Sequence, residues 1–199
     1  MKPTMLVIGD SFMTQDPDYP GQHWSEMLPE YHVVNLSRAG ASMSWIADQL
    51  VHGLKSNPAV AVVGLTEITR LQFIADDNIS VYSSCHADRM SSDEKLLYKL
   101  WVSIVPQQFK YVSACAHVAF IFETLCKRNI PFVWHPLLFN PCGQDDNLIN
   151  FVFDDYQHCK LSQDIWGHAH KDRPKFHIDD RDWQMQFANN VRTMLTNTN

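Results

Sequence analysis

A chain of 199 residues, 45% hydrophobic and 12% aromatic, is long enough to bury a core and is typical of one folded domain over residues 1–199. Its formal net charge of −6 gives little electrostatic support for binding nucleic acid. The apolar start of the chain is too short for a signal peptide and no stretch approaches membrane-spanning length, so we expect a cytoplasmic protein without a membrane partner.

Four short apolar runs predict the strands of one sheet. Their continuous apolar character is typical of parallel strands that are buried on both faces. The runs are Thr4–Asp10, His32–Ser37, Ala59–Leu65 and Ile130–Pro136. Amphipathic segments between and after them predict helices over Ser42–Pro58, Phe109–Asn129 and Asp179–Leu195. This alternation predicts an α/β fold, with helices on both faces of a parallel sheet of four to five strands.

The stretch from Ile68 to Ser92 is polar and irregular, with a short strand expected near Val81. It is long for a passive connection. We therefore expect it to form part of a pocket wall or a contact in a homo-oligomer.

The first strand ends in Gly9-Asp10-Ser11, where a hydroxyl follows a sharp turn. Ligands of open parallel sheets bind beyond the carboxyl ends of the strands, so Ser11 is a candidate nucleophile. We expect the Asp10 carboxylate to accept backbone hydrogen bonds that hold the turn. A role as a turn or cap residue explains such a serine equally well. The choice between this role and that of a nucleophile depends on the residues of the remaining loops.

Three later loops carry further candidate groups. Gly40 follows the second strand, where its backbone N–H can reach an oxyanion. The third strand is followed by Gly64, Thr66 and Arg70, and His177 directly precedes the last helix. Each has a plainer interpretation when taken alone, for example a helix-entry glycine or a capping histidine.

Taken in order, these blocks resemble the SGNH/GDSL hydrolase family, and the resemblance runs from Gly9 to about Ala188. It implies a flavodoxin-like, doubly wound α/β/α sandwich in three layers and no cofactor. It also implies that Ser11 is the nucleophile, that the N–H groups of Ser11 and Gly40 form the oxyanion hole, and that His177 is the base.

Two blocks depart from the family pattern. Thr66 stands where the family has an Asn side chain, so a shorter hydroxyl has to act as the third oxyanion donor. Pro174 stands three residues before His177, where the family has the Asp that orients the base. We assign Asp172 as the substitute, while a Ser-His dyad stays open. The nearby carboxylates are Asp172, Asp179 and Asp180, of which the last two also suit a helix N-cap.

His168 is the rival base, because Asp164 stands four residues before it. We prefer His177, since it directly precedes the last helix as the family's histidine does. His168 and His170 could also bind a metal from one strand face, but no third or fourth ligand is evident. The five cysteines form no CxxC pair, so we expect no metal site.

The resemblance implies a serine esterase that cleaves short acyl esters or O-acetyl groups, including those on carbohydrate, through an acyl-enzyme on Ser11. Arg70 and Trp24 are candidate substrate contacts, although a local pair with Glu67 and a place in the core are their commoner roles. The alternative is a catalytically weakened binding or virion-associated protein, which the departures at Thr66 and Pro174 favour. The chain is also similar to small phage-encoded members of the family, which implies the host cytoplasm or the virion as its location.

Overall fold

The computed structural model describes residues 1–15, 20–75, 78–82, 90–136, 152–162 and 180–197, and of residues 73–75 and 78–82 the backbone alone. Its main sheet has four strands in the order β2-β1-β3-β6, all parallel. These are β1 (Thr4–Ile8), β2 (His32–Asn35), β3 (Val60–Gly64) and β6 (Phe132–His135). The predicted parallel sheet is confirmed, and each strand is one or more residues shorter than the apolar run that predicted it.

The central strands β1 and β3 are almost entirely apolar because helices cover both faces of the sheet. On β1, Leu6 and Ile8 pack into one core, whereas Met5 and Val7 pack into a second core on the opposite face. All four side chains are fully buried. Alternate residues of a strand point to opposite faces, so a run without polar residues indicates two buried faces.

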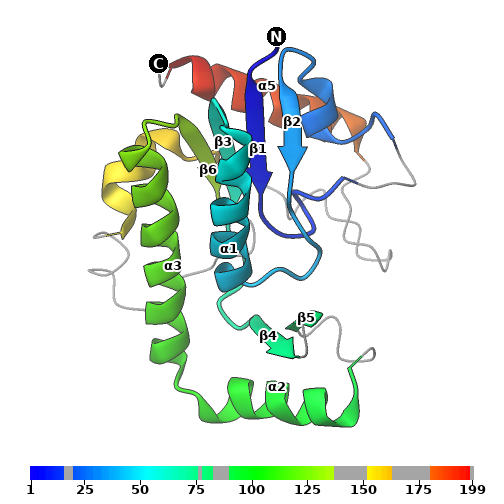
Figure 1. Cartoon of the computed structure of the whole chain (residues 1–199), viewed down its shortest axis with the longest axis vertical. Coiled ribbons are helices and arrows are strands. Elements are labelled where there is room, and N and C mark those ends of the chain that lie inside the picture. The colour runs from blue at the N-terminus through cyan, green and yellow to red at the C-terminus, as the bar shows by residue number, and fades with distance from the viewer. Residues whose placement is uncertain (16–19, 76–77, 83–89, 137–151, 163–179, 198–199) are drawn as a thin grey trace.

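Helices α1 (Met43–Gly53) and α3 (Gln107–Lys127) cover the first face, and α5 (Arg181–Asn197) covers the second together with the short helix η1 (Trp24–Met27) (Figure 1). The three predicted helices and the three-layer arrangement are confirmed. Of the two serines at the start of α1, Ser42 is the N-cap, because its hydroxyl accepts a hydrogen bond from Trp45 N at 3.2 Å.

Beside β6, the described residues form a single bridge at the place where a fifth strand would lie. Lys160 forms an isolated parallel bridge with Trp134, and Leu161 N donates to the Trp134 carbonyl at 2.7 Å. The preceding 3₁₀ helix, η4 (Asp154–Cys159), covers this edge. Among the described residues the sheet therefore has four strands, the lower limit of the four to five that the sequence predicts.

Between β3 and α3 the chain forms an excursion that the sequence reading largely missed. It contains an antiparallel hairpin of β4 (Leu71–Ala75) and β5 (Asn78–Tyr82), and then helix α2 (Ser92–Ile104). Figure 1 shows this excursion beyond the carboxyl ends of the main strands, at the end of the molecule farthest from both termini. The short strand expected near Val81 is β5, whereas α2 was not predicted.

Within the described residues, α3 is the one helix long and apolar enough to cross a membrane, with 21 residues and a mean hydropathy of 1.2. The expectation that no stretch approaches membrane-spanning length is therefore wrong, although length and composition are the only criteria that α3 meets. Tyr111, Val118 and Phe122 of α3 lie in the core against the sheet. A core helix passes the same test as a membrane span, so the match carries little weight.

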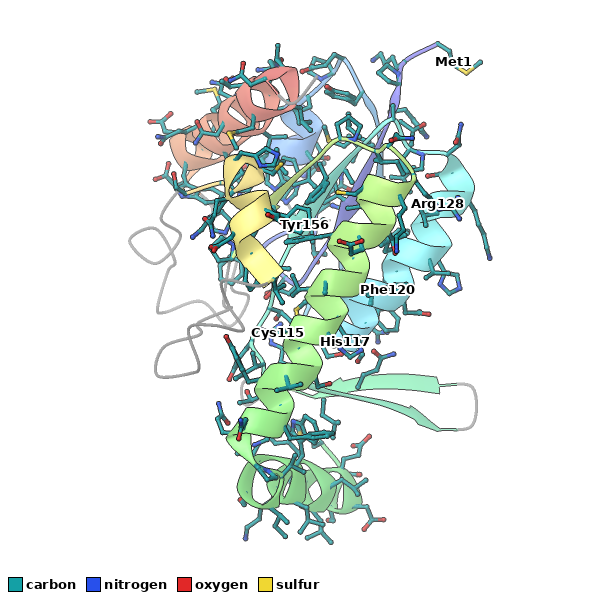
Figure 2. The ribbon with its side chains drawn as sticks, turned by 90° about the vertical axis from the view of Figure 1, so that its left-hand side faces the viewer. Met1, Cys115, His117, Phe120, Arg128 and Tyr156 are labelled. Atoms are coloured by element: carbon teal, nitrogen blue, oxygen red, sulfur yellow. The ribbon has the colours of Figure 1, made fainter. Side chains whose placement is uncertain are left out.

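We predict that Phe122→Ala lowers the free energy of unfolding by about 3–5 kcal/mol, because the cavity it leaves lies inside an aromatic cluster. The Phe122 ring centroid lies 4.9 Å from that of Tyr156, 5.1 Å from that of Phe132 and 5.5 Å from that of Trp134. Chemical denaturation measures the change. Phe120→Ala, on the same helix but 47% exposed, is the control and should stay within about 0.5 kcal/mol of the parent (Figure 2). Equal losses in both variants would contradict this packing.

Candidate active site

The turn after β1 presents Ser11 while it buries the residue before it. Ser11 is partly exposed, whereas Asp10 is fully buried. The turn is tight, since Met13 N donates to the Asp10 carbonyl at 3.0 Å. A Cβ added to Gly9 would lie 2.7 Å from Met13 Cγ and 3.1 Å from the Gly64 carbonyl oxygen. Gly9 thus lets the loops after β1 and β3 approach each other closely.

The buried Asp10 carboxylate accepts three hydrogen bonds. Its Oδ1 accepts from Phe12 N at 3.0 Å, which confirms the expected turn-holding role. Its Oδ2 accepts from the Thr66 hydroxyl at 3.1 Å and from Arg70 Nη1 at 3.2 Å. The carboxylate therefore joins its own turn to the segment that follows β3.

Arg70 is the residue whose role the sequence reading missed. Its side chain is 4% exposed and pairs with Asp10, so the expected local pair with Glu67 is wrong. The Glu67 carboxylate instead accepts a hydrogen bond from the Thr69 hydroxyl. Arg70 Nη1 also donates to the Ala41 carbonyl at 3.2 Å, which draws the loop after β2 into the same network. A pair separated by 60 residues leaves no spacing signal in the sequence.

Burial dominates the electrostatics of Asp10. It raises the pKa of this carboxyl above its ordinary value, while the charge of Arg70 and the hydrogen bonds from Phe12 and Thr66 act in the opposite direction. The three donors all suit the ionised carboxylate, which has acceptors only.

Gly40 lies where the loop after β2 turns, with a φ of +78° in the left-handed region that favours glycine. Arg38 N donates to the Gly9 carbonyl at 3.1 Å, which places this loop beside the Ser11 turn. Within the described part of the chain, the backbone N–H groups of Ser11 and Gly40 have no hydrogen-bond acceptor. These two N–H groups therefore stay candidates for the oxyanion hole that the resemblance predicts.

Thr66 is fully buried. Its hydroxyl has one proton, and that proton is donated to Asp10. The expectation of a third oxyanion donor at this position therefore gains no support from the hydrogen bonds of Thr66. The residue acts here as part of the carboxylate network.

Trp24 is completely buried in the second core, where its ring centroid lies 5.1 Å from that of Phe187. Its backbone N–H donates to Gln184 Oε1 at 2.9 Å. Trp24 is therefore a core residue that joins η1 to α5, and the suggestion that it contacts substrate is wrong.

The predicted base and its orienting carboxylate belong to a segment outside the described residues. His177, Asp172 and the rival His168 fall there, together with Pro174, Asp179, Asp164 and His170. Their roles stay predictions. Asp180 is described, and its carboxylate accepts from Asp182 N at 3.0 Å and Trp183 N at 3.1 Å, which confirms its role as a cap of α5.

The solved structures that resemble this chain include esterases. The chain superposes on the psychrotrophic esterase EstA from Pseudoalteromonas sp. with a TM-score of 0.59 and 10% identity over 98% of both chains. The acetyl xylan esterase AlAXEase gives 0.56 and 13% over 96% of this chain and 98% of the other. AlinE4, an SGNH-hydrolase family esterase, gives 0.51 and 15% over 87% and 85%.

No family model matches the sequence, and neither does any curated protein. At identities this low the likeness establishes the fold. The chain has the SGNH-hydrolase fold, as the Gly9-Asp10-Ser11 block predicts from the sequence.

We predict that Arg70→Met lowers the free energy of unfolding at pH 7 by about 3–5 kcal/mol, because Asp10 then lacks its counter-charge in a buried position. The loss should be smaller at pH 5. A raised pKa means that the folded state binds this proton more tightly than the unfolded chain does, so stability falls as pH rises above the unfolded pKa. Denaturant unfolding at the two pH values measures both effects.

The double variant Arg70→Met/Asp10→Asn is the control for that experiment, because it removes both charges together. It should recover part of the lost stability and abolish the difference between pH 5 and pH 7. A double variant less stable than Arg70→Met at pH 7 would show that the pair is not what the fold depends on.

Proposed function

We propose that this protein is an SGNH-type serine hydrolase that cleaves carboxylic esters through an acyl-enzyme on Ser11. The observation that carries the proposal is the pairing of a partly exposed Ser11 with two backbone N–H donors that lack acceptors within the described residues, those of Ser11 and Gly40. Both groups stand on loops that the Asp10–Arg70 network holds together. The esterases that share the fold support the same chemistry.

The proposed reaction has two halves. In the first, His177 removes the Ser11 proton while the oxygen attacks the ester carbonyl, and then protonates the departing alcohol. The Ser11 and Gly40 N–H groups stabilise the negative oxygen of the tetrahedral intermediate. In the second half, His177 activates a water molecule that releases the acid and restores the serine.

Short acyl esters or O-acetyl groups on carbohydrate are the proposed substrates. The acetyl xylan esterase among the solved structures of this fold supports this choice, since its name describes an enzyme that acts on acetylated xylan. Without a third oxyanion donor the reaction lacks roughly 2.7–4 kcal/mol of transition-state stabilisation, so activated esters are the most sensitive substrates for detecting activity.

A non-catalytic binding protein is the second candidate. The bond from the Thr66 hydroxyl to Asp10 favours it, because that hydroxyl then stabilises the loop instead of a transition state. The two candidates differ in the reactivity of Ser11, which a covalent probe reports directly.

We predict that a fluorophosphonate labels the protein once and that Ser11→Ala abolishes labelling. The same variant should lower kcat/KM for p-nitrophenyl acetate by at least about 10⁴-fold, since no nucleophile remains to form the acyl-enzyme. Intact-mass spectrometry and initial rates provide the readouts. Ser37→Ala, which changes a serine on the neighbouring loop, is the control and should keep both properties. A parent protein that takes up no label would favour the binding protein.

We predict further that His177→Ala lowers kcat/KM by about 10²–10⁴-fold, as expected for loss of a general base, while His168→Ala changes it less than about threefold. Asp172→Asn should fall between the two if that carboxylate orients the imidazole. The three variants are compared on p-nitrophenyl acetate after circular dichroism has shown that each is folded. The reverse order for the two histidines would transfer the base to His168.

A further inference from the structure

A small cavity of about 80 Å³ lies between the start of α1, the segment after β3, α2 and α3. Ile68, Arg70 and Gln72 form one wall, so the expectation that this stretch forms a pocket wall is confirmed. Lys110 and His117 of α3 form the opposite wall, and Figure 2 shows His117 on α3 near the β4–β5 hairpin. Pockets for whole drug-sized ligands are about 300–1,000 Å³, so this one fits a group of a few atoms.

Lys110 is the unusual residue of the cavity, because it is a buried ammonium that forms no ion pair with a carboxylate in the described part of the chain. It is 2% exposed, its Nζ donates to the Val102 carbonyl at 2.9 Å, and it lies 5.8 Å from the Trp101 ring centroid. Burial lowers the pKa of this amine. A buried charge without a counter-charge is costly, so an anion in the cavity would lower the free energy of the site.

Two further residues that line the cavity carry N–H groups without an acceptor among the described residues. The charge of Arg70 is balanced by Asp10, but its buried Nε–H has no acceptor within the described residues. Gln72 Oε1 accepts from the Ser44 hydroxyl at 3.0 Å, and its side-chain NH₂ has no acceptor among those residues. The cavity lining thus contains the Lys110 ammonium, which forms no ion pair among the described residues, and two further N–H donors. These donors are Arg70 Nε–H and the Gln72 side-chain amide.

The other titratable groups of the cavity limit what it can hold. Glu67 also lines it and brings a negative charge. His117 Nδ1 lies 2.6 Å from the Ser113 carbonyl, so Nδ1 carries the proton and Nε2 is an acceptor in the neutral ring. Because the lining holds the Glu67 carboxylate as well as the Lys110 ammonium, the cavity suits a singly charged planar group better than a doubly charged one.

We propose that this cavity binds a single carboxylate group, with Lys110 as its counter-charge and Arg70 and Gln72 as hydrogen-bond donors. Arg70 connects the cavity to the catalytic turn, because its guanidinium also holds Asp10, the residue before Ser11. On the proposed function, the carboxylate belongs to an acidic ester substrate. A separate small acid is the other source of the same chemistry.

The first test is binding of sodium acetate to the full chain carrying Ser11→Ala, which needs no turnover. Isothermal titration should give saturable binding that Lys110→Met weakens at least tenfold. Glu67→Gln should strengthen it, because a repulsive charge is removed. Lys99→Met, at an exposed lysine of α2, is the matched control and should leave binding unchanged. No binding, or equal binding in Lys110→Met, would overturn the proposal.

Lys110→Met should fold, since it replaces a buried, unbalanced charge with an apolar side chain of similar length. Its thermal midpoint without acetate should equal or exceed that of the parent. A lower midpoint of Lys110→Met together with unchanged acetate binding by that variant would identify the lysine as structural and overturn its assigned role.

The second test distinguishes the two sources of the carboxylate. For 4-acetoxybenzoate, Lys110→Met should lower kcat/KM at least tenfold, whereas for its uncharged methyl ester the value should stay unchanged. Equal effects on both esters, with acetate altering both rates in the parent, would assign the cavity to a separate acid. Acetate binding without hydrolysis of either ester would refute the esterase alone. Hydrolysis of both esters without acetate binding would refute the carboxylate site alone.

Discussion

The buried ion pair of Asp10 and Arg70 is the interaction on which the candidate site depends. A carboxylate without access to water needs a donor for each oxygen, and here the donors come from separate segments of the chain. Loss of any one would leave a buried charge poorly compensated, so the segments are fixed relative to one another. Through Ala41, Arg70 extends this constraint to the loop of Gly40. The partly exposed Ser11 is therefore presented by a turn that this network holds in place.

This arrangement also explains what Thr66 does in place of a carboxamide. Its short side chain reaches Oδ2 of Asp10, where its hydroxyl proton is used to stabilise the buried charge. On the proposed function, transition-state stabilisation rests on the backbone N–H groups of Ser11 and Gly40. Backbone donors need no side-chain ordering and cost no reorganisation during the reaction. Thr66 would then contribute to the carboxylate network and not to the oxyanion hole.

The sheet could be predicted because strands buried on both faces consist mostly of apolar residues. Such a run of consecutive apolar residues is visible in the sequence itself. The Ser11 turn was predictable for the same reason, since a strand end is visible in the sequence. Helix α2 was not, because it buries none of its residues and its apolar side chains, such as Leu96 and Ile104, stay exposed. The partner of Arg70 is an effect of tertiary structure alone. Trp24 was suggested as a pocket residue because nothing local distinguishes a core indole from a binding one.

The proposed cavity gives a physical reason for an arginine at position 70. A guanidinium carries its donors on a rigid planar fork, so Nη1 can hold Asp10 and Ala41 while Nε–H faces elsewhere. A lysine could balance the charge of Asp10 but has no second, fixed direction for a donor. One residue can therefore anchor the catalytic turn and contribute to a neighbouring carboxylate site. The Arg70 side chain that binds a carboxylate in that cavity would then also set the position of Asp10, the residue before Ser11.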